Sequence, residues 1–324
     1  MRLTTKLASL VATVILVSFF TFLLTQLIPG DPVVSVLGSA YNPATPEGRE
    51  QIEVVRKELG LDDPYPVRYF NWAKGVFTGD LGNKIGVNSA GITTNRILKE
   101  RLPVTLEIMV LTQILALLIS IPAGVWSAHR ENKAPDKAIT GASFAMLAMP
   151  TFVIGLLLVW LFSVKLGWLP SSGYTRLTED LGENLRSMII PVLSLGLGLA
   201  AVYTRLLRAE MISTLKEDYI LMANAKGISP RRVLLRHALR PSSFALLTIA
   251  GINVGALIGG AVIIENFMAI PGVGSALVQA VAEREYEVIL SLVFVISMFY
   301  VVANFIVDIL YSFLDPRIRR GATR

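Results

Sequence analysis

Apolar residues are gathered along this chain into six long stretches that contain few charged side chains. A helix of about 20 apolar residues is long enough to cross the hydrocarbon core of a membrane. Each stretch is predicted to be helical, because lipid offers backbone N–H and C=O groups no other hydrogen-bonding partner. The six predicted spans are residues 7–28, 104–126, 139–164, 187–203, 244–264 and 288–314.

Two of these stretches have unusual features. The first follows Arg2 and Lys6, as the core of a signal peptide would, but it is longer than a usual signal core and no small-x-small cleavage site follows it. It is therefore predicted to remain as a membrane span. The fourth stretch is short and contains Pro191, Gly196 and Gly198, so a bent helix or one buried by its neighbours is expected.

The composition agrees with a membrane protein. Of the 324 residues, 53% are hydrophobic and 17% are charged, whereas about 25% of the residues in a soluble domain are charged. The chain has no cysteine, which excludes disulfides and cysteine-based metal sites. The predicted fold class is an all-α membrane protein.

Lys and Arg residues are concentrated in the loops on one side of the predicted spans. The N-terminus, the loops after the second and fourth spans and the C-terminal tail are rich in them, and the loop after the fifth span has only Arg284. Because short cationic loops stay on the cytoplasmic side, both termini are predicted to be cytoplasmic. The net charge of +6 thus follows from membrane topology, and no nucleic-acid partner is predicted.

The connection 30–103 is predicted to form a small helical subdomain outside the membrane. Thr45 and Pro46 suit the N-cap and first residue of a helix that ends at Gly60. A second helix is predicted at 67–77, with apolar residues along one face. The predicted organisation is a span at 1–29, this subdomain, a five-helix membrane core at 104–314 and a cytoplasmic tail at 315–324.

Motifs of soluble enzymes are absent from the sequence. The chain has no Gly-Lys dipeptide, which excludes a phosphate-binding P-loop, and no His-Glu-x-x-His or Gly-x-Ser-x-Gly motif. No catalytic residue, metal site or bound cofactor is predicted. If the protein uses ATP, another chain must bind it.

The cytoplasmic loop 205–243 is the most informative segment. Asp218 suits the N-cap of a short helix that ends at Gly227, and Ser229 with Pro230 suits the start of a second helix. These signals predict two short helices between the fourth and fifth spans.

One face of the first short helix is mixed apolar and basic. Tyr219, Met222, Ala223 and Lys226 share this face by their spacing. Such a face suits docking into a groove of a partner protein, and it equally suits a helix that lies on anionic lipid. The spacing alone leaves both interpretations open.

This loop resembles the cytoplasmic signature of ABC importer permeases. Dipeptide and oligopeptide permeases commonly read Asp-Tyr-Val-x-x-Ala-x-Ala-Lys-Gly and then Arg-His-Ala-Leu, and similar stretches begin here at Asp218 and Arg236. The chain departs from the broader signature at Leu221, where glutamate is usual, and at Pro241, which is one place late. The residues predicted to contact an ATPase are Asp218, Tyr219, Met222, Ala223, Ala225, Lys226, Gly227, Arg236 and His237.

Other stretches resemble the same family in the same order along the chain. Residues 29–32 match Pro-Gly-Asp-Pro, and Asp315 begins a terminal Asp-Pro-Arg. Leu59 to Asp62 and residues 79–82 resemble landmarks of the external domain. The chain also matches an extracytoplasmic loop motif of the family, at Glu265, Pro271, Gly272 and Gly274. It departs from this motif at Met268, where an aromatic residue is usual.

The resemblance implies the type I ABC importer permease fold, with six transmembrane helices in the cell membrane. The implied partners are a second, similar permease chain, two ATPase subunits that bind ATP and magnesium, an extracytoplasmic substrate-binding protein and membrane lipid. The implied function is ATP-driven uptake of di- or oligopeptides, coupled through the short helix in loop 205–243. Nickel complexes, glutathione or another small solute remain alternative cargoes.

Two classes outside ABC transporters are less well supported. Secondary transporters driven by ion gradients usually have paired broken helices or inverted repeats, which the sequence does not show. An intramembrane enzyme would need a reactive dyad or metal site at membrane depth, and the second to fifth spans offer little beyond Glu107, Asn253 and hydroxyl groups.

Several residues in the spans have two interpretations. Gln113 and Asn253 could line a water-filled path or form interhelical hydrogen bonds. Asp308 and Glu107 lie near span ends, which favours structural roles. Gly251, Gly255 and Gly259 are spaced four residues apart on the fifth span. This spacing indicates either close helix packing or a helix beside the translocation path.

Overall fold

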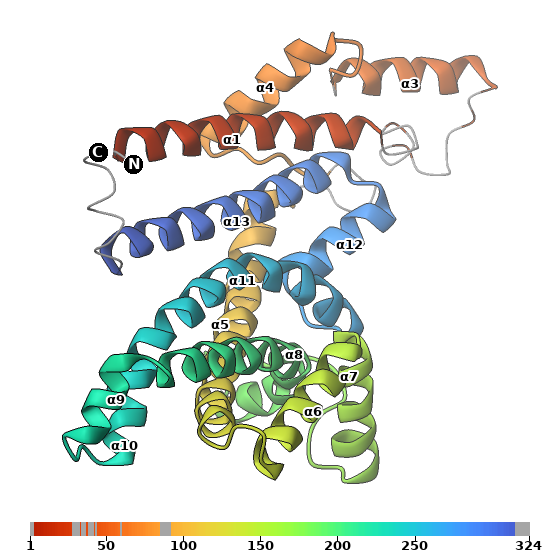
Figure 1. Cartoon of the computed structure of the whole chain (residues 1–324). Helices are drawn as coiled ribbons and strands as arrows, with labels where there is room; N and C mark the ends of the chain where they lie inside the picture. Colours follow the sequence, from red (N-terminus) through yellow and green to blue (C-terminus); the bar gives the residue numbers. More distant parts are fainter. Residues whose placement is uncertain are drawn as a thin grey trace. The chain divides into compact units, whose positions relative to one another are not determined.

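The computed structural model describes residues 3–27, 33, 37, 42, 44–58, 60–84 and 92–314, of which residues 3–6, 58 and 308–314 are described by their backbone alone. Throughout these ranges the regular elements are helices (Figure 1), and Asn83 and Thr93 form an isolated β-bridge. The elements are α1 (Leu3–Gln26), α3 (Pro46–Glu58), α4 (Tyr65–Thr78), α5 (Thr94–His129), α6 (Ala134–Ala148), α7 (Thr151–Leu158), η1 (Val159–Lys165), α8 (Leu181–Leu215), α9 (Asp218–Ala225), α10 (Pro230–Arg232), η2 (Val233–Ala238), α11 (Leu239–Phe267), α12 (Val273–Glu283) and α13 (Tyr286–Leu314).

The predicted all-α membrane fold is confirmed. Five helices of the described chain are long and apolar enough to cross a membrane, and a sixth span results if the bent pair formed by α6 and α7–η1 is counted as one. The six spans fall on the six apolar stretches of the sequence. The helices extend beyond several of these stretches, because polar residues at a span's ends continue the same backbone ladder.

The third predicted span, over 139–164, consists of two helical parts in the structure. It is broken between α6 and α7, whose axes differ in direction by 105°. The break falls at Met149 and Pro150, where Met149 is extended with φ −100° and ψ 131°. Proline disfavours the helical conformation of the residue before it. Pro150 is the local sequence signal for this break, which the unbroken apolar run does not show.

The fourth span also differs from its predicted bounds of 187–203. Helix α8 runs without interruption through Pro191 for 35 residues. The predicted cytoplasmic loop 205–243 is shorter in the structure, since residues 205–215 belong to α8 and residues 239–243 to α11.

The chain divides into two compact units. The first comprises residues 1–104 and 271–302, and the second comprises residues 105–270 and 303–324. In the first unit, an aromatic cluster joins three helices: Tyr69 packs edge-on to Phe22, and Trp72 packs edge-on to Phe294. The Tyr69 hydroxyl also shares a 2.8 Å hydrogen bond with Ser18.

The two helices predicted for the connection 30–103 are confirmed as α3 and α4. The Thr45 hydroxyl accepts a hydrogen bond of 3.1 Å from the N–H of Gly48 at the start of α3. Gly60 (φ 59°) and Gly79 (φ 86°) follow the two helices in the left-handed conformation, which glycine adopts without steric cost. The side of the membrane on which these helices lie stays a prediction.

Some predicted features lie outside the described residues. These are the Pro-Gly-Asp-Pro stretch at 29–32, Leu59, the tail 315–324 with its Asp-Pro-Arg, and the side chain of Asp308.

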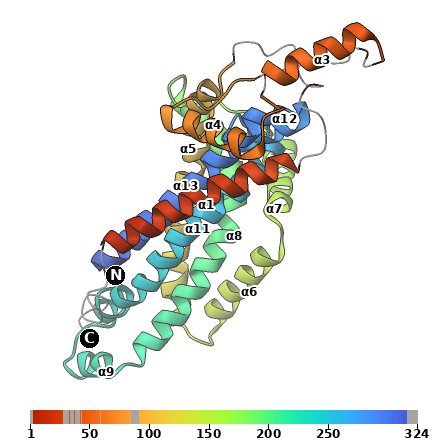
Figure 2. The ribbon, with the colours of Figure 1, turned by 90° about the horizontal axis from the view of Figure 1, so that it is seen from above.

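In the second unit, α8 is the central helix. It packs against α6, α7 and α11, and Figure 2 shows α6 running alongside α8. Two glycines also bring α8 close to α5: a Cβ on Gly196 of α8 would lie 2.9 Å from Leu115, and one on Gly124 of α5 would lie 3.0 Å from Leu207. Helix α8 then leads directly into α9, with α10 beside it (Figure 1).

Candidate functional site

The candidate site is the segment that contains α9. This helix begins at Asp218, and its N-cap is Glu217, whose side chain makes no capping hydrogen bond. The prediction of Asp218 as the N-cap was therefore wrong by one residue. Asp218 instead occupies the first turn, where a carboxylate is favoured by the positive end of the helix dipole.

One face of α9 is anchored in the second unit. Ile220 is 1% exposed and Ala223 is 7% exposed, and both belong to a core cluster with Met211 of α8 and Val233 of η2. An isoleucine side chain contributes about 1.5–3 kcal/mol when fully buried. Burial of these two residues fixes the orientation of the helix on the end of α8.

The other face of α9 is exposed and apolar. Tyr219 is 45% exposed, Leu221 is 59% exposed and Met222 is 58% exposed. The predicted docking face is thereby divided, since Ala223 points into the subunit while Tyr219 and Met222 point out of it. Exposed apolar groups gathered on a short helix mark an interaction surface.

The C-terminal end of α9 has the conformation that the sequence predicts. Lys226 is the C-cap, and Gly227 has φ 73°. The N–H of Gly227 donates to the carbonyl of Asn224 at 2.9 Å, and that of Ile228 donates to Ala223 at 3.2 Å. A Cβ on Gly227 would meet no atom within 4 Å, so glycine serves the backbone conformation here.

The second short helix begins at the predicted place. Ser229 is the N-cap and Pro230 the first residue of α10. In the following η2, Arg236 is exposed and His237 is half-buried. The Tyr219 hydroxyl donates to the carbonyl of His237 at 3.4 Å, and burial, helped by nearby Glu217, raises the pKa of Tyr219. The remaining predicted contact residues, Asp218, Ala225, Lys226 and Gly227, are exposed.

A buried ion pair close to this segment was not predicted. Asp136 of α6 is 2% exposed and pairs with Arg208 of α8. The signal in the sequence was an aspartate three residues before the predicted start of the third span at 139. Arg208 was counted only as a loop cation.

Gln113 takes part in an interhelical hydrogen bond. Its amide donates to the hydroxyl of Tyr203 at 3.1 Å, and this hydroxyl donates to the backbone carbonyl of Ala250 at 3.5 Å. Tyr203 is fully buried, so α5, α8 and α11 meet at this hydroxyl. For Gln113 the structure shows a bond between helices, whereas the role of Asn253, which is half-buried on α11, stays a prediction.

The three predicted glycines of α11 are in different environments. A Cβ on Gly251 would lie 2.6 Å from Val307 of α13, whereas one on Gly259 would meet nothing within 4 Å. Gly255 is buried. Gly260, which was not predicted, approaches Leu195 of α8, to which a Cβ would be 2.9 Å distant. The glycines of α11 thus pack closely against two different helices, α13 at Gly251 and α8 at Gly260, and do not form a single packing face.

The predicted extracytoplasmic loop motif is split by secondary structure. Glu265 is a fully buried residue in the last turn of α11, where it accepts a 2.6 Å hydrogen bond from Thr105 of α5. Its prediction as a loop residue was wrong, because α11 continues to Phe267. Gly272 is the N-cap of α12, Gly274 is buried in the first turn of that helix, and Pro271 is exposed.

Glu107 of α5 accepts a 2.8 Å hydrogen bond from the hydroxyl of Tyr174, which lies in the loop before α8. Burial, reinforced by the bond to this carboxylate, raises the pKa of Tyr174 to about 12. The interaction gives Glu107 a structural role, as the sequence favoured.

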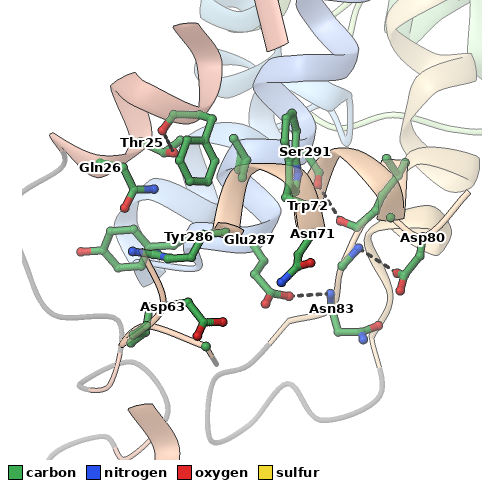
Figure 3. A pocket seen from close by; sticks show the side chains of 18 residues that line it. Thr25, Gln26, Asp63, Asn71, Trp72, Asp80, Asn83, Tyr286, Glu287 and Ser291 are labelled. Carbon is green, nitrogen blue, oxygen red and sulfur yellow. Dashed lines mark hydrogen bonds between the residues drawn. The ribbon is translucent and has the colours of Figure 1, made fainter. Parts of the chain in front are cut away.

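A cavity of about 470 Å³ lies in the first unit. Figure 3 shows polar side chains converging on it, and Glu287 accepts a 3.2 Å hydrogen bond from the N–H of Asn83 at its wall. Asp63 and Asp80 also line it, together with the ring of Trp72. Among the described residues, no group of three or more acidic or histidine side chains is arranged to hold a metal ion. None of the predicted site residues lies in this wall.

The structure is that of an integral membrane protein with a short helix anchored at the end of one of its spans. Two family models match the chain: one for binding-protein-dependent transport system inner membrane components over residues 120–320, and one for the N-terminal part of such components over residues 2–109. The chain belongs to this family. It is a permease subunit of an ABC transporter, located in the inner membrane, and the family implies a substrate-binding protein and ATPase subunits as partners.

Individual relatives match almost the whole chain. A probable peptide ABC transporter permease protein, y4tP, from Sinorhizobium fredii is 35% identical over 97% of both chains. The oligopeptide transport system permease protein AppB from Bacillus subtilis is 36% identical over 93% of this chain and 94% of its own. The glutathione transport system permease protein GsiC from Escherichia coli is 33% identical over 97% of both chains.

Proposed function

We propose that this chain forms the translocation pathway of an ATP-driven importer of di- or oligopeptides, and that α9 is its coupling helix to an ATPase subunit. The observation that carries the proposal is the division of α9 into an anchored face, with Ile220 and Ala223, and an exposed apolar face, with Leu221 and Met222. A lipid-bound helix would direct its apolar face to the membrane without needing this rigid connection to α8.

The proposed assembly contains a second, similar permease chain, two ATPase subunits and an extracytoplasmic binding protein. ATP and magnesium bind to the ATPase subunits, which is consistent with the absence of a P-loop motif from this sequence. Both termini and α9 lie on the cytoplasmic side. When the ATPase subunits close, they displace α9, and α8 carries the displacement into the spans. ATP shifts this equilibrium only because the two states of the transporter bind α9 differently.

The names of the relatives support the proposed cargo. The relatives from Sinorhizobium fredii and Bacillus subtilis are named for peptides and oligopeptides, and the one from Escherichia coli for glutathione. Glutathione is itself a tripeptide with an unusual linkage, so it is the second candidate cargo. Competition of a labelled dipeptide by unlabelled dipeptide and by glutathione separates the two.

The proposal is tested by reconstituting the complete transporter in proteoliposomes with ATP supplied to the ATPase side. Uptake of a labelled dipeptide should require ATP, magnesium and the binding protein, and should survive an ionophore that dissipates ion gradients. Uptake by this chain alone, or uptake that persists without ATP, would rule the proposal out.

The role of α9 is tested by placing a charge on its exposed face. Leu221→Asp and Met222→Asp should each reduce ATP-driven uptake about tenfold or more, which is equivalent to losing about 1.4 kcal/mol of coupling energy. Both side chains are more than half exposed, so membrane insertion should not change. Val54→Asp on α3 is the matched control, because Val54 is 51% exposed, and it should transport normally. Normal uptake by both α9 variants would contradict the assignment of α9.

A further inference from the structure

Asp136 forms an unusually complete set of hydrogen bonds. Its carboxylate accepts from Arg208 at both oxygens, at 2.6 Å from Nε and 2.7 Å from Nη2. It also accepts from the hydroxyl of Ser127 at 2.5 Å and from the N–H of Asn132 at 2.8 Å. Thr140 donates a longer bond of 3.4 Å. A buried carboxylate requires such compensation.

These partners come from three helices and the turn between two of them. Ser127 is in the last turns of α5, Asn132 is in the α5–α6 turn with φ 64°, and Arg208 is in α8. The bidentate guanidinium bond ties Asp136 on α6 to Arg208 on α8 with a defined donor–acceptor geometry. Asp136 therefore holds the α5–α6 turn in a defined orientation on α8.

The same face of α8 makes two more contacts with this hairpin. The Arg205 guanidinium lies 4.4 Å from the ring centroid of Phe144 on α6. Lys216, the C-cap of α8, lies 3.7 Å from the carboxylate of Glu131 in the α5–α6 turn. The contacts extend along α8 to the residue that ends it, directly before α9, so they lie where a displacement of α9 would enter the bundle.

The Asp136 carboxylate is buried, whereas the Arg208 side chain is 27% exposed. Replacing such a pair by well-packed apolar groups is often close to neutral for stability, because the buried charge must lose its hydration. What an apolar contact does not reproduce is the fixed geometry of a bidentate pair. The pair is therefore suited to a place where relative orientation of two helices matters.

We infer that Asp136 is a positioning residue for energy coupling: through Arg208 it makes the α5–α6 hairpin move with α8 and α9 as one body. This inference rests on the proposed coupling role of α9. With the pair intact, a displacement of α9 is delivered to α5, α6 and α8 together. Without the ion pair, α9 and α8 move but the α5–α6 hairpin does not follow them fully. Less peptide is then transported for each ATP hydrolysed.

The test compares transport with ATP hydrolysis in the complete transporter. The double variant Asp136→Asn/Arg208→Met removes both charges together and keeps an acceptor for the N–H of Asn132. It should assemble with its partners and hydrolyse ATP at the normal rate, while peptide taken up per ATP falls about fivefold or more, the lower end of ordinary coupling between sites. Arg208→Lys keeps the positive charge but loses the planar, bidentate guanidinium. This variant should also lower the amount of peptide taken up per ATP.

The matched control is a solvent-exposed pair on the same helix. Arg186 and Glu183 are 2.8 Å apart, with side chains 53% and 52% exposed. The double variant Glu183→Leu/Arg186→Met should retain the normal ratio of peptide to ATP. A normal ratio in Asp136→Asn/Arg208→Met as well would overturn the inference.

A second measurement does not depend on transport. Spin labels at Arg130→Cys in the α5–α6 turn and Leu221→Cys on α9 report their separation in the full chain, which has no native cysteine. The distance distribution should be narrow with the native pair and clearly broader in Asp136→Asn/Arg208→Met. If the distance distribution broadens in Asp136→Asn/Arg208→Met but the native transporter does not couple ATP to uptake, the proposed function fails. In that case the mechanical role of the ion pair stands. An unchanged narrow distribution would refute that role directly.

Discussion

At the scale of single residues, the buried hydroxyl of Tyr203 shows how polar groups are accommodated between apolar helices. It is fully buried and bonds the side chain of Gln113 and the carbonyl of Ala250. Tyr203→Phe should lower the stability of the solubilised protein by about 1–2 kcal/mol, because these two groups lose a hydrogen-bonding partner. The change is measured as a lower midpoint of thermal unfolding. Tyr65→Phe, at a site 63% exposed, should leave the midpoint unchanged.

Another residue-scale prediction concerns alkaline pH. Burial and the bond to Glu107 raise the pKa of Tyr174 to about 12, above the value of about 10 for an unfolded tyrosine. The folded state therefore holds this proton more tightly. The associated stability is complete below pH 10 and is lost as the pH rises from about 10 to about 12. Absorbance titration should show a tyrosine that titrates near pH 12, and Tyr174→Phe should remove it. Its persistence in that variant would assign it to another tyrosine.

At the scale of helices, α11 offers a matched pair of glycines. In Gly251→Ala the new methyl would lie 2.6 Å from Val307, so the overpacked interface should cost about 1–3 kcal/mol. In Gly259→Ala the methyl meets nothing within 4 Å, and stability should be unchanged or slightly higher because alanine favours helix. Thermal unfolding of the two variants checks this, and equal midpoints would contradict the packing described for α11.

The helices also show which signals in the sequence were sufficient to predict where a helix begins, ends or breaks. Gly227, Ser229 and Pro230 marked the end of α9 and the start of α10 correctly, because capping depends on a few adjacent residues. The break in the third span also has a local signal, because Pro150 disfavours a helical conformation of Met149. The inward orientation of Ala223 had no local signal, since it depends on contacts with Met211 and Val233 in other elements.

At the scale of the whole molecule, the proposed orientation in the membrane can be tested with single cysteines, since the chain has none of its own. A membrane-impermeant maleimide applied to intact cells should label Val54→Cys on α3. It should label Arg130→Cys in the α5–α6 turn only after permeabilisation. Both positions are exposed, so accessibility in the folded chain does not bias the comparison. The reverse pattern would invert the proposed topology.

The sequence by itself determined that this is an all-helical membrane protein, where its apolar stretches lie and where the short helix α9 ends. These properties follow from the length of apolar runs and from capping motifs, which involve residues close together in the chain. Tertiary structure alone decided that Glu265 is buried against Thr105, that Gly260 packs where Gly259 does not, and that Asp136 meets Arg208. Each of these depends on which faces of distant helices come together, and the packing of side chains at a helix crossing, not the local sequence, selects those faces.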